Sequence, residues 1–280
     1  MITPAEEEFL ARHAYVPEHL PGYGRAFSGG EVFLRGHFLC YYREGTLIFV
    51  GYPLREACEE REMKIHLAEA IKRFQPSRVA LMAPSFSDPG GERKPGDHYY
   101  RLDLRSSRIP SKIKNMTHRA GRELRIEKSR EFRADHQKLI DDFLGSREVE
   151  EGARIIFNRI GPYLSSVSTA WIFDARDSKG RLAGFDVADF GSTDYAFYLF
   201  NFRSRQSPVP GTSDLLLYAL IQKAQKEGKS YLNLGLGINE GVTFFKKKWG
   251  GMPFLRHEII LLSPRRPSFL NSIFRGMFSA

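Results

Sequence analysis

A glycine, a threonine and a serine at the expected start of a helix form the first candidate binding site in this 280-residue chain. Gly211, Thr212 and Ser213 precede apolar residues that recur at helical spacing from Leu217 to Ala224. The first backbone N–H groups of a helix have no partner inside it, and they attract a phosphate or a developing oxyanion. A simple helix cap, in which Thr and Ser bond only to nearby backbone, is the alternative that this pattern leaves open.

The strand expected just before this helix carries two polar side chains, Tyr198 and Asn201. Tyr198 can serve as a general acid, although the density of Tyr and Phe in this strand favours core packing. Asp186 and Asp189, on the preceding strand, are candidate general bases. Because side chains alternate along a strand, the two carboxylates do not share a face, so at most one of them points at a site.

A glycine-rich loop, Gly235 to Gly241, follows the expected strand Tyr231 to Leu234. Asn233, Asn239 and Glu240 border this loop and can orient an acceptor amine, while a turn-forming role is the stronger expectation for Asn239. The loop imitates a dinucleotide-binding fingerprint. Its third glycine is one position late and it does not open a βαβ unit, so we reject a Rossmann site.

Three consecutive lysines follow on a second expected helix, beside Phe245 and Trp249. The two aromatic residues are four positions apart, so both can pack inward. Lys246 is turned roughly 100° from Phe245 and can lie at the edge of that apolar face, within reach of a site. Lys247 and Lys248 are expected to face water. One solvated face carrying all three lysines is the alternative.

The net charge of +9 is concentrated in one segment. Residues 101–133 contain eight Arg and three Lys against four acidic residues, which accounts for +7. A basic balance favours an anionic partner: nucleic acid, a phosphate-bearing cofactor or an anionic membrane. Arg119, Arg122 and Arg125 are candidate contacts for tRNA phosphates or an anionic acceptor, with a solvated basic helix as the alternative. No aromatic residues interleave with these arginines, which gives base stacking little support.

The elements that must position these residues occur in the same order in both halves of the chain. In the first half, strand, strand, helix and strand are expected at 31–42, 47–52, 67–74 and 78–82. In the second half they are expected at 182–190, 195–202, 217–224 and 231–234. The repeated order predicts a mixed α/β fold of two similarly built lobes, although their sequences are not visibly similar.

The segment 84–96 is rich in Pro and Gly and is expected to be an exposed loop near the junction of the lobes. We therefore predict one lobe over residues 1–103 and a second over 104–280. From about residue 264 the chain has a basic tail with apolar residues at helical spacing, which are Phe269, Leu270, Ile273, Phe274, Met277 and Phe278. Such a helix can lie on an anionic membrane, and packing onto the protein itself is the alternative.

The two cysteines, Cys40 and Cys58, form no metal-binding pattern and indicate a reduced, intracellular chain. A Cys–His nucleophile that uses His37 or His66 is an alternative, but buried inert thiols are more common. The N-terminus lacks an apolar signal core, and no apolar run is long enough to span a bilayer. We expect a cytoplasmic protein and leave open peripheral attachment to the inner face of the membrane.

The second half of the chain resembles the C-terminal core of the FemABX-type aminoacyltransferases and of phosphatidylglycerol lysyltransferase C-terminal (DUF2156-like) domains. Both groups belong to the GNAT acyltransferase superfamily. A Ser-Asp-Leu-Leu segment, a Tyr-Leu-x-Leu-Gly strand and a Gly-x-x-x-Phe-Lys-x-x-Trp-Gly helix carry the resemblance, at Gly211–Leu216, Tyr231–Gly235 and Gly241–Gly250. Trp249 stands where the family usually has Phe. Tyr100 to Leu104, with the basic helix that ends at Gly121, is similar to the segment that opens the second domain in these families.

The resemblance implies tandem GNAT-like lobes with the donor site in the second lobe. It places Lys246 at the donor end, where the family lysine is thought to steady charge on the transferring carbonyl. Catalytic candidates are Lys246, Tyr198 and Asn233, and donor-binding candidates are Asn201, Gly211, Thr212, Ser213 and Phe245. The acetyl-CoA form of the donor loop is usually Arg/Gln-x-x-Gly-x-Gly/Ala. Here residues 206–212 have one glycine and two prolines, which favours the Fem-like branch.

The function that follows is acyl or aminoacyl transfer to an amine or hydroxyl by direct attack on the donor carbonyl. The donor is expected to be aminoacyl-tRNA or acyl-CoA, used as a co-substrate, with no tightly bound cofactor and no metal. A GNAT-shaped module without catalysis, which binds an anionic ligand, nucleic acid or membrane, is the rival hypothesis. The sequence does not indicate an oligomeric state or the identity of the acceptor.

Overall fold

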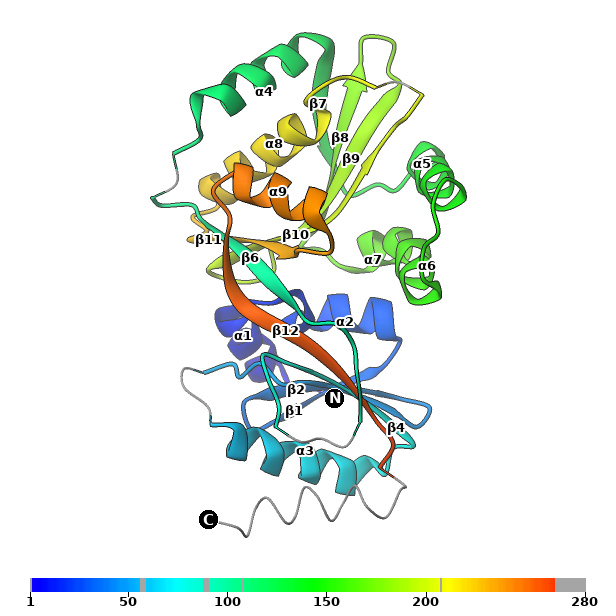
Figure 1. Cartoon of the computed structure of the whole chain (residues 1–280), viewed down its shortest axis with the longest axis vertical. Coiled ribbons are helices and arrows are strands. Elements are labelled where there is room, and N and C mark those ends of the chain that lie inside the picture. Colours follow the sequence, from blue (N-terminus) through cyan, green and yellow to red (C-terminus); the bar gives the residue numbers. More distant parts are fainter. Residues whose placement is uncertain (1, 56–58, 88–90, 107, 207, 265–280) are drawn as a thin grey trace.

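The computed structural model describes residues 2–55, 59–87, 91–106, 108–206 and 208–264. Within these residues twelve strands form one mixed sheet that runs through both halves of the chain, with helices on both of its faces (Figure 1). The mixed α/β fold expected from the sequence is therefore confirmed. The tail with its apolar stripe from Phe269 to Phe278 lies outside the described residues, as does Cys58.

The first lobe, at the bottom of Figure 1, is built mainly from the N-terminal part of the chain. Its elements are α1 (Pro4–His13), a 3-10 turn η1 (Pro17–His19), α2 (Pro21–Ser28), β1 (Glu31–Arg35), β2 (Phe38–Arg43), β3 (Thr46–Val50), α3 (Glu60–Phe74), β4 (Arg78–Ala83) and β5 (Glu92–Arg93). The prediction of a single strand over 31–42 is wrong. Gly36 adopts a left-handed conformation with φ 55° and turns the chain, so that β1 and β2 pair antiparallel.

The second lobe, at the top of Figure 1, contains the candidate site residues. Its elements are α4 (Ser111–Glu123), β7 (Leu124–Ser129), α5 (Ala134–Gly145), α6 (Glu151–Asn158), α7 (Ile160–Ser166), β8 (Ala170–Asp177), β9 (Leu182–Asp189), β10 (Tyr195–Arg203), α8 (Thr212–Lys226), β11 (Tyr231–Leu236) and α9 (Glu240–Lys248). The predicted hairpin, helix and strand are β9, β10, α8 and β11, in that order. The sequence did not predict the strands β7 and β8, which extend the sheet. It also did not predict the helices α5, α6 and α7, which cover the face of the sheet opposite α8.

Two long strands join the lobes. β6 (Asp97–Asp103) pairs with β11 on one side and with β12 (Met252–Leu262) on the other. β12 pairs with β6 over residues 252–257 and then with β4 of the first lobe over residues 258–262. Figure 1 shows this strand running from the upper lobe down into the lower one. A division at Asp103 therefore leaves part of the last strand in the sheet of the first lobe.

Helix α8 is held in place because most of its length is apolar and buried. Leu216, Leu217 and Leu220 are all fully buried, and they pack on the face of the sheet that carries Phe173 and Ala188. Burial of one such side chain stabilises the fold by roughly 1.5–3 kcal/mol. The start of α8 is thus fixed relative to β9 and β10, and with it the predicted donor loop.

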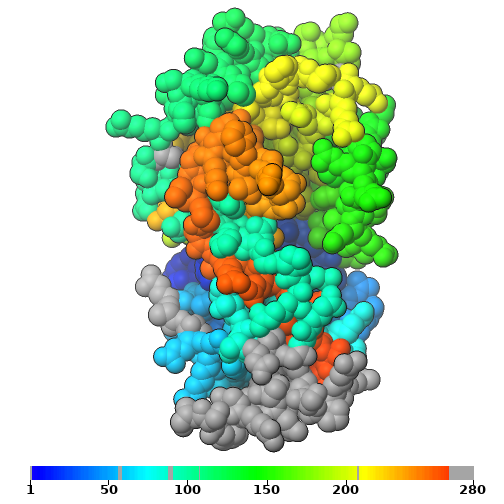
Figure 2. Space-filling model, in the orientation of Figure 1, coloured from blue at the N-terminus to red at the C-terminus, as the bar shows by residue number. Residues whose placement is uncertain are grey.

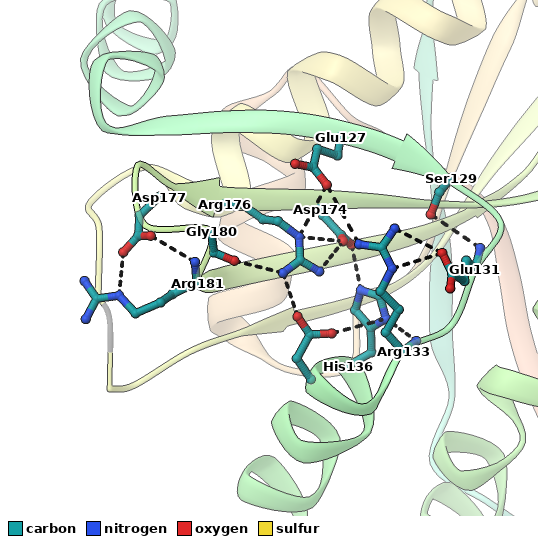
Figure 3. A network of polar contacts seen from close by, with 11 residues as sticks. Glu127, Ser129, Glu131, Arg133, His136, Asp174, Arg176, Asp177, Gly180 and Arg181 are labelled. Atoms are coloured by element: carbon teal, nitrogen blue, oxygen red, sulfur yellow. Dashed lines mark hydrogen bonds and ion pairs between the residues drawn. The ribbon is translucent and has the colours of Figure 1, made fainter.

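A buried polar network fixes α5 on the other face of the sheet (Figure 3). Oδ1 of Asp174 on β8 lies 2.8 Å from Nε2 of His136, and its Oδ2 lies 2.7 Å from Nη2 of Arg176. The backbone N–H of Arg133 donates to Nδ1 of His136, so the ring proton lies on Nε2 and is donated to Asp174. Arg176 also pairs with Asp135 of α5 at 2.6 Å. The network links two elements and lies away from the α8 face.

Candidate active site

Strands β10 and β11 pair only at their beginnings. Their parallel bonding covers Tyr195–Phe197 and Tyr231–Asn233, although β10 continues to Arg203 and β11 to Leu236. The pairing of β10 with β9 shifts register after Tyr198, which marks a β-bulge where β10 and β11 part. Beyond this point the two strands no longer bond to each other. Backbone groups on their facing edges are therefore available to side chains or to a ligand.

The side chain of Lys246 enters this opening. Lys246 is only 3% exposed, and its Nζ donates a hydrogen bond to the carbonyl of Leu236 at the end of β11. A Cβ built on Gly235 would lie 3.5 Å from Nζ of Lys246 and also 3.5 Å from the carbonyl oxygen of Tyr198. One cationic group therefore lies between the two diverging strands, although α9 itself forms part of the molecular surface (Figure 2).

Burial changes the charge state of Lys246. Loss of solvent lowers the pKa of its ammonium from the ordinary value to about 7, and the carboxylate of Asp97 offsets part of this shift. A lysine with a pKa near neutrality exchanges its proton readily at physiological pH. Perturbed lysines of this kind are typical of catalytic sites, where they act as acids, bases or charge stabilisers.

The other two lysines of α9 differ from one another. Lys247 is exposed, as predicted. The prediction that Lys248 faces water is wrong, because its Nζ forms a 2.6 Å ion pair with Asp214 in the first turn of α8. Trp249 is buried, as predicted, and its Nε1 donates to the same carboxylate at 2.9 Å. Asp214 therefore docks the end of α9 onto α8 and so holds Lys246 in the opening.

The sequence did not identify Asp214 as a functional residue. Its position in the Ser-Asp-Leu-Leu segment was a usable signal, because an acidic residue in the first turn of a helix is stabilised there. Phe245 is half-buried and packs against the core cluster of the second lobe. The inward packing predicted for Phe245 and Trp249 is confirmed.

Asn233 lies beside the opening, but both polar atoms of its side-chain amide are hydrogen-bonded to backbone groups. Its Nδ2 donates to the carbonyl of Tyr15 at 2.8 Å, and its Oδ1 accepts from the backbone N–H of Gly235 at 2.8 Å. The side chain thus fixes the turn next to Lys246 and ties it to the N-terminal segment. Asn239 is the N-cap of α9, where it accepts from the backbone N–H of Val242, so its predicted turn role is confirmed.

Tyr198 is almost completely buried in the core cluster of the second lobe. Burial raises the pKa of its hydroxyl well above the ordinary value, and the carboxylates of Asp186 and Asp214 add to the shift. A phenol that holds its proton this tightly is a poor general acid, and the ring of Tyr198 contributes to core packing. The backbone carbonyl of Tyr198, rather than its ring, faces Gly235.

Gly211 and Thr212 form the turn that starts α8. Thr212 is fully buried, and its hydroxyl donates to the carbonyl of Val209 at 2.7 Å. Gly211 is the N-cap, has φ 84° and provides no side-chain cap. A Cβ built on Gly211 would lie 2.9 Å from Cγ of Met116 on α4. The glycine is therefore required by its conformation and by the close approach of α4.

The replacement Gly211→Val is expected to destabilise the fold. A β-branched residue at positive φ costs roughly 1–3 kcal/mol, and the clash with Met116 adds to this. Gly228→Val at the other end of α8 is the matched control, because Gly228 has φ 73° and no atom within 4 Å of its Cβ position. In urea denaturation, the free energy of unfolding should fall by about 1 kcal/mol or more further for Gly211→Val than for Gly228→Val. Equal losses would show that α4 does not restrict this position.

The structure brings together Asn201 and Ser213 from the predicted donor-binding set. The hydroxyl of Ser213 donates to Oδ1 of Asn201 at 3.1 Å, and Nδ2 of Asn201 donates to Oδ1 of Asp186 at 2.6 Å. Asp186 is completely buried on β9. Asp189, three residues later, instead bonds to the hydroxyl of Tyr163 and to the N–H of Gly191. The two aspartates face different partners, as the alternation along the strand predicted.

The three candidate arginines do not form one group. Arg119 and Arg122 are exposed on α4, whose buried face carries Ile113, Thr117 and Ala120. Arg125 lies on β7, because the helix ends at Glu123. It pairs in register with Arg176, on the side of the sheet that faces α5. An anion bound to the outer face of α4 would therefore contact Arg119 and Arg122 but not Arg125.

Cys40 is completely buried, and burial raises the pKa of its thiol above the ordinary range. It is thus an inert thiol rather than a nucleophile. Among the residues that the structure describes, no group of three or more His, Cys, Asp or Glu could hold a metal ion. In the same residues, no helix has the length and apolar character needed to cross a bilayer.

Comparison with known proteins bears on the fold. No protein-family model and no curated protein matches the chain. A C-terminal domain (DUF2156) named for a lysylphosphatidylglycerol synthetase of Agrobacterium fabrum is 14% identical with a TM-score of 0.61, covering 98% of this chain and 96% of that chain. FemX is 10% identical with a TM-score of 0.62, covering 92% and 96%. A tandem GNAT protein from the clavulanic acid biosynthesis pathway is 12% identical with a TM-score of 0.51, covering 80% and 78%. The chain therefore has the tandem GNAT fold that the resemblance in its sequence implied.

Proposed function

We propose that the protein transfers an acyl or aminoacyl group from an activated donor to an amine or hydroxyl. The transfer takes place in the opening between β10 and β11. The observation that carries this proposal is the buried ammonium of Lys246, which lies where β10 and β11 have ceased to pair with each other. Acceptor attack on the donor carbonyl converts its oxygen to an oxyanion, and a fixed cation stabilises that charge.

The covalent steps need no intermediate on the enzyme. The acceptor nitrogen or oxygen forms a bond to the carbonyl carbon, and the bond from that carbon to the donor's oxygen or sulfur breaks. The proton of the acceptor passes to the leaving group or to water. The ammonium of Lys246 stabilises the negative charge on the carbonyl oxygen during the attack. Asn233 fixes the turn and Asp214 fixes the helix that together position Lys246.

An aminoacyl-tRNA donor is favoured over acyl-CoA. Lys248, a cation close to the first turn of α8, is already paired with Asp214 and so is not free to hold a pyrophosphate there. The loop before α8 also departs from the glycine-rich form that acyl-CoA enzymes use. The exposed face of α4 carries Lys112, Lys114, Arg119 and Arg122. Such a face suits the phosphates of tRNA.

A lipid acceptor would suit the basic tail and a membrane surface. The similarity to a domain named for lysylphosphatidylglycerol synthesis supports this part of the proposal. An aminoacyl-tRNA donor would place the reaction in the cytoplasm, with the protein peripheral at the inner face of the membrane.

Thermal-shift screening tests the donor. The protein is incubated with aminoacyl-tRNA, uncharged tRNA and acyl-CoAs, and the ligand that stabilises it by mass action is identified. Loss of the acyl group from that donor is then followed with a lipid extract and, separately, with an amine-metabolite extract as the source of acceptor. Binding of a donor without any transfer in either extract would support the non-catalytic module instead.

The pH dependence of transfer should report the charge of Lys246. With a pKa of about 7, its ammonium is present below neutral pH and is lost as the pH rises through 7. Transfer to a hydroxyl acceptor should therefore have a kcat/KM that falls above pH 7. Lys246→Arg should retain part of the activity without this fall, because a guanidinium stays charged. A kcat/KM that rises through pH 7 would identify Lys246 as a general base and contradict the assignment.

A further inference from the structure

A chain of hydrogen bonds fixes the direction of the Ser213 hydroxyl at the start of α8. Asp186 lies at the buried end of the chain, Asn201 is half-buried in the middle, and Ser213 is half-buried at the outer end. Oδ1 of Asp186 accepts from Nδ2 of Asn201 at 2.6 Å, and Oδ1 of Asn201 accepts from Oγ of Ser213 at 3.1 Å. Three elements, β9, β10 and α8, each contribute one member.

Asp186 determines which way the amide of Asn201 points. A carboxyl oxygen that accepts a hydrogen bond requires the NH2 group of the amide on its side, so the amide oxygen faces Ser213. The hydroxyl proton of Ser213 is then committed to Asn201. Only the lone pairs of its oxygen remain for a ligand.

Neutralisation of Asp186 does not reverse this direction. Burial raises the pKa of the carboxyl well above the ordinary value. Because Oδ1 accepts from Asn201, the proton of the neutral acid lies on Oδ2, which is buried and has no hydrogen-bond partner among the described residues. In this arrangement Asp186 accepts from Asn201 whether or not Oδ2 carries a proton.

The Ser213 hydroxyl thus offers acceptor lone pairs to a ligand at the first turn of α8. The next residue, Asp214, also carries acceptor oxygens, and its Oδ1 is already bonded to Lys248 and Trp249. A phosphate is itself an acceptor and gains nothing from these oxygens. A group that carries hydrogen atoms on nitrogen or oxygen is complementary to them.

We propose that Ser213, oriented by Asn201 and Asp186, binds a hydrogen-bond-donating group of the donor substrate. An aminoacyl ester of a ribose offers two such groups, the α-ammonium and the neighbouring ribose hydroxyl. Ser213 would contact substrate, whereas Asn201 and Asp186 are positioning residues. The chain of three residues selects aminoacyl esters over simple acyl groups. The inference rests on the proposed aminoacyl-transfer function and adds a basis for donor selection to it.

Binding of stable donor analogues tests the inference. The probes are 3′-deoxy-3′-aminoacylamino-adenosines carrying lysyl or alanyl groups, the 3′-propionylamino analogue without the ammonium, and the 2′-deoxy analogues without the hydroxyl. Calorimetry gives Kd for the full chain and for Ser213→Ala. If the ammonium is the partner, Ser213→Ala weakens binding of the aminoacyl probes about tenfold or more and leaves the propionyl probe unchanged. If the ribose hydroxyl is the partner, the loss is roughly threefold to tenfold and is confined to probes with that hydroxyl.

Two variants of Asp186 separate positioning from folding. Asp186→Asn keeps an oxygen for Asn201 and should preserve the preference among probes, whereas Asp186→Leu removes it and should reduce that preference as Ser213→Ala does. Losses with Ser213→Ala that are equal for all probes would overturn the inference while leaving the proposed function intact. Failure of the wild-type chain to bind any adenosine probe, with normal binding of acyl-CoA, would overturn both the aminoacyl donor and this inference.

Discussion

Replacing Lys246 with alanine is expected to lower turnover by about a hundredfold or more, the usual effect of removing one group that stabilises an oxyanion. Lys246 is the cation that lies in the opening between β10 and β11, and its Nζ reaches the backbone of β11. Donor binding should change little, because the charge that Lys246 stabilises develops only during the attack. The measurement is kcat and KM for transfer from the donor that the thermal-shift screen identifies.

Lys247→Ala is the matched control for this experiment. It removes an adjacent lysine of the same helix whose side chain is exposed. Lys248→Ala is unsuitable as a control, since it breaks the ion pair with Asp214 that docks α9 on α8. Similar, small losses in Lys246→Ala and Lys247→Ala would show that α9 carries no catalytic cation and would favour a binding module.

Lys246→Met is expected to make the protein more stable while it lowers turnover as Lys246→Ala does. A fall in pKa from 10.5 to about 7 corresponds to an unfavourable free energy on the order of 5 kcal/mol for the buried ammonium at neutral pH. Methionine avoids this cost but leaves the carbonyl of Leu236 without its donor, a loss of about 1–3 kcal/mol. A net gain on the order of 2 kcal/mol or more should appear in urea denaturation at pH 7.

The stability gain of Lys246→Met should depend on pH. Between pH 7 and 10.5 the unfolded lysine binds a proton that the folded one has lost, so wild-type stability rises with pH in this window. The advantage of methionine should therefore shrink as the pH increases from 7 to 10. A constant advantage across this range would mean that Lys246 is not desolvated in the folded protein. Lys247→Met should leave stability nearly unchanged at every pH.

Much of the second lobe could be predicted from local sequence. The apolar spacing in α8, the short strand β11 and the Phe245–Trp249 pair each depend on residues within a few positions of one another. The same holds for Asn239, which was expected to form a turn and accepts from the backbone N–H of Val242 three positions later. Residue patterns at this range fix backbone conformation and the buried face, and these expectations are met.

Interactions between segments that are far apart in the chain could not be predicted from the sequence. The division of β12 between two lobes follows from its pairing with β4 and β6, strands that lie about 150 to 180 positions earlier in the chain. The partner of Lys248 is Asp214, on another helix, and the reason for Gly211 is the approach of α4. A residue pattern shows that a group is charged or small, and it does not show what that group faces.

The sequence by itself determined the order of β9, β10, α8 and β11, the mixed α/β class and the identity of Lys246 as the lysine at the edge of an apolar face. Only the tertiary structure decided that Lys246 is buried between diverging strands, where loss of solvent moves its pKa toward neutrality. It also joined Asp186, Asn201 and Ser213 into one hydrogen-bonded chain. The physical reason is that solvation and hydrogen-bond direction depend on every group that surrounds a side chain. Those groups come from strands and helices that only the folded sheet brings together.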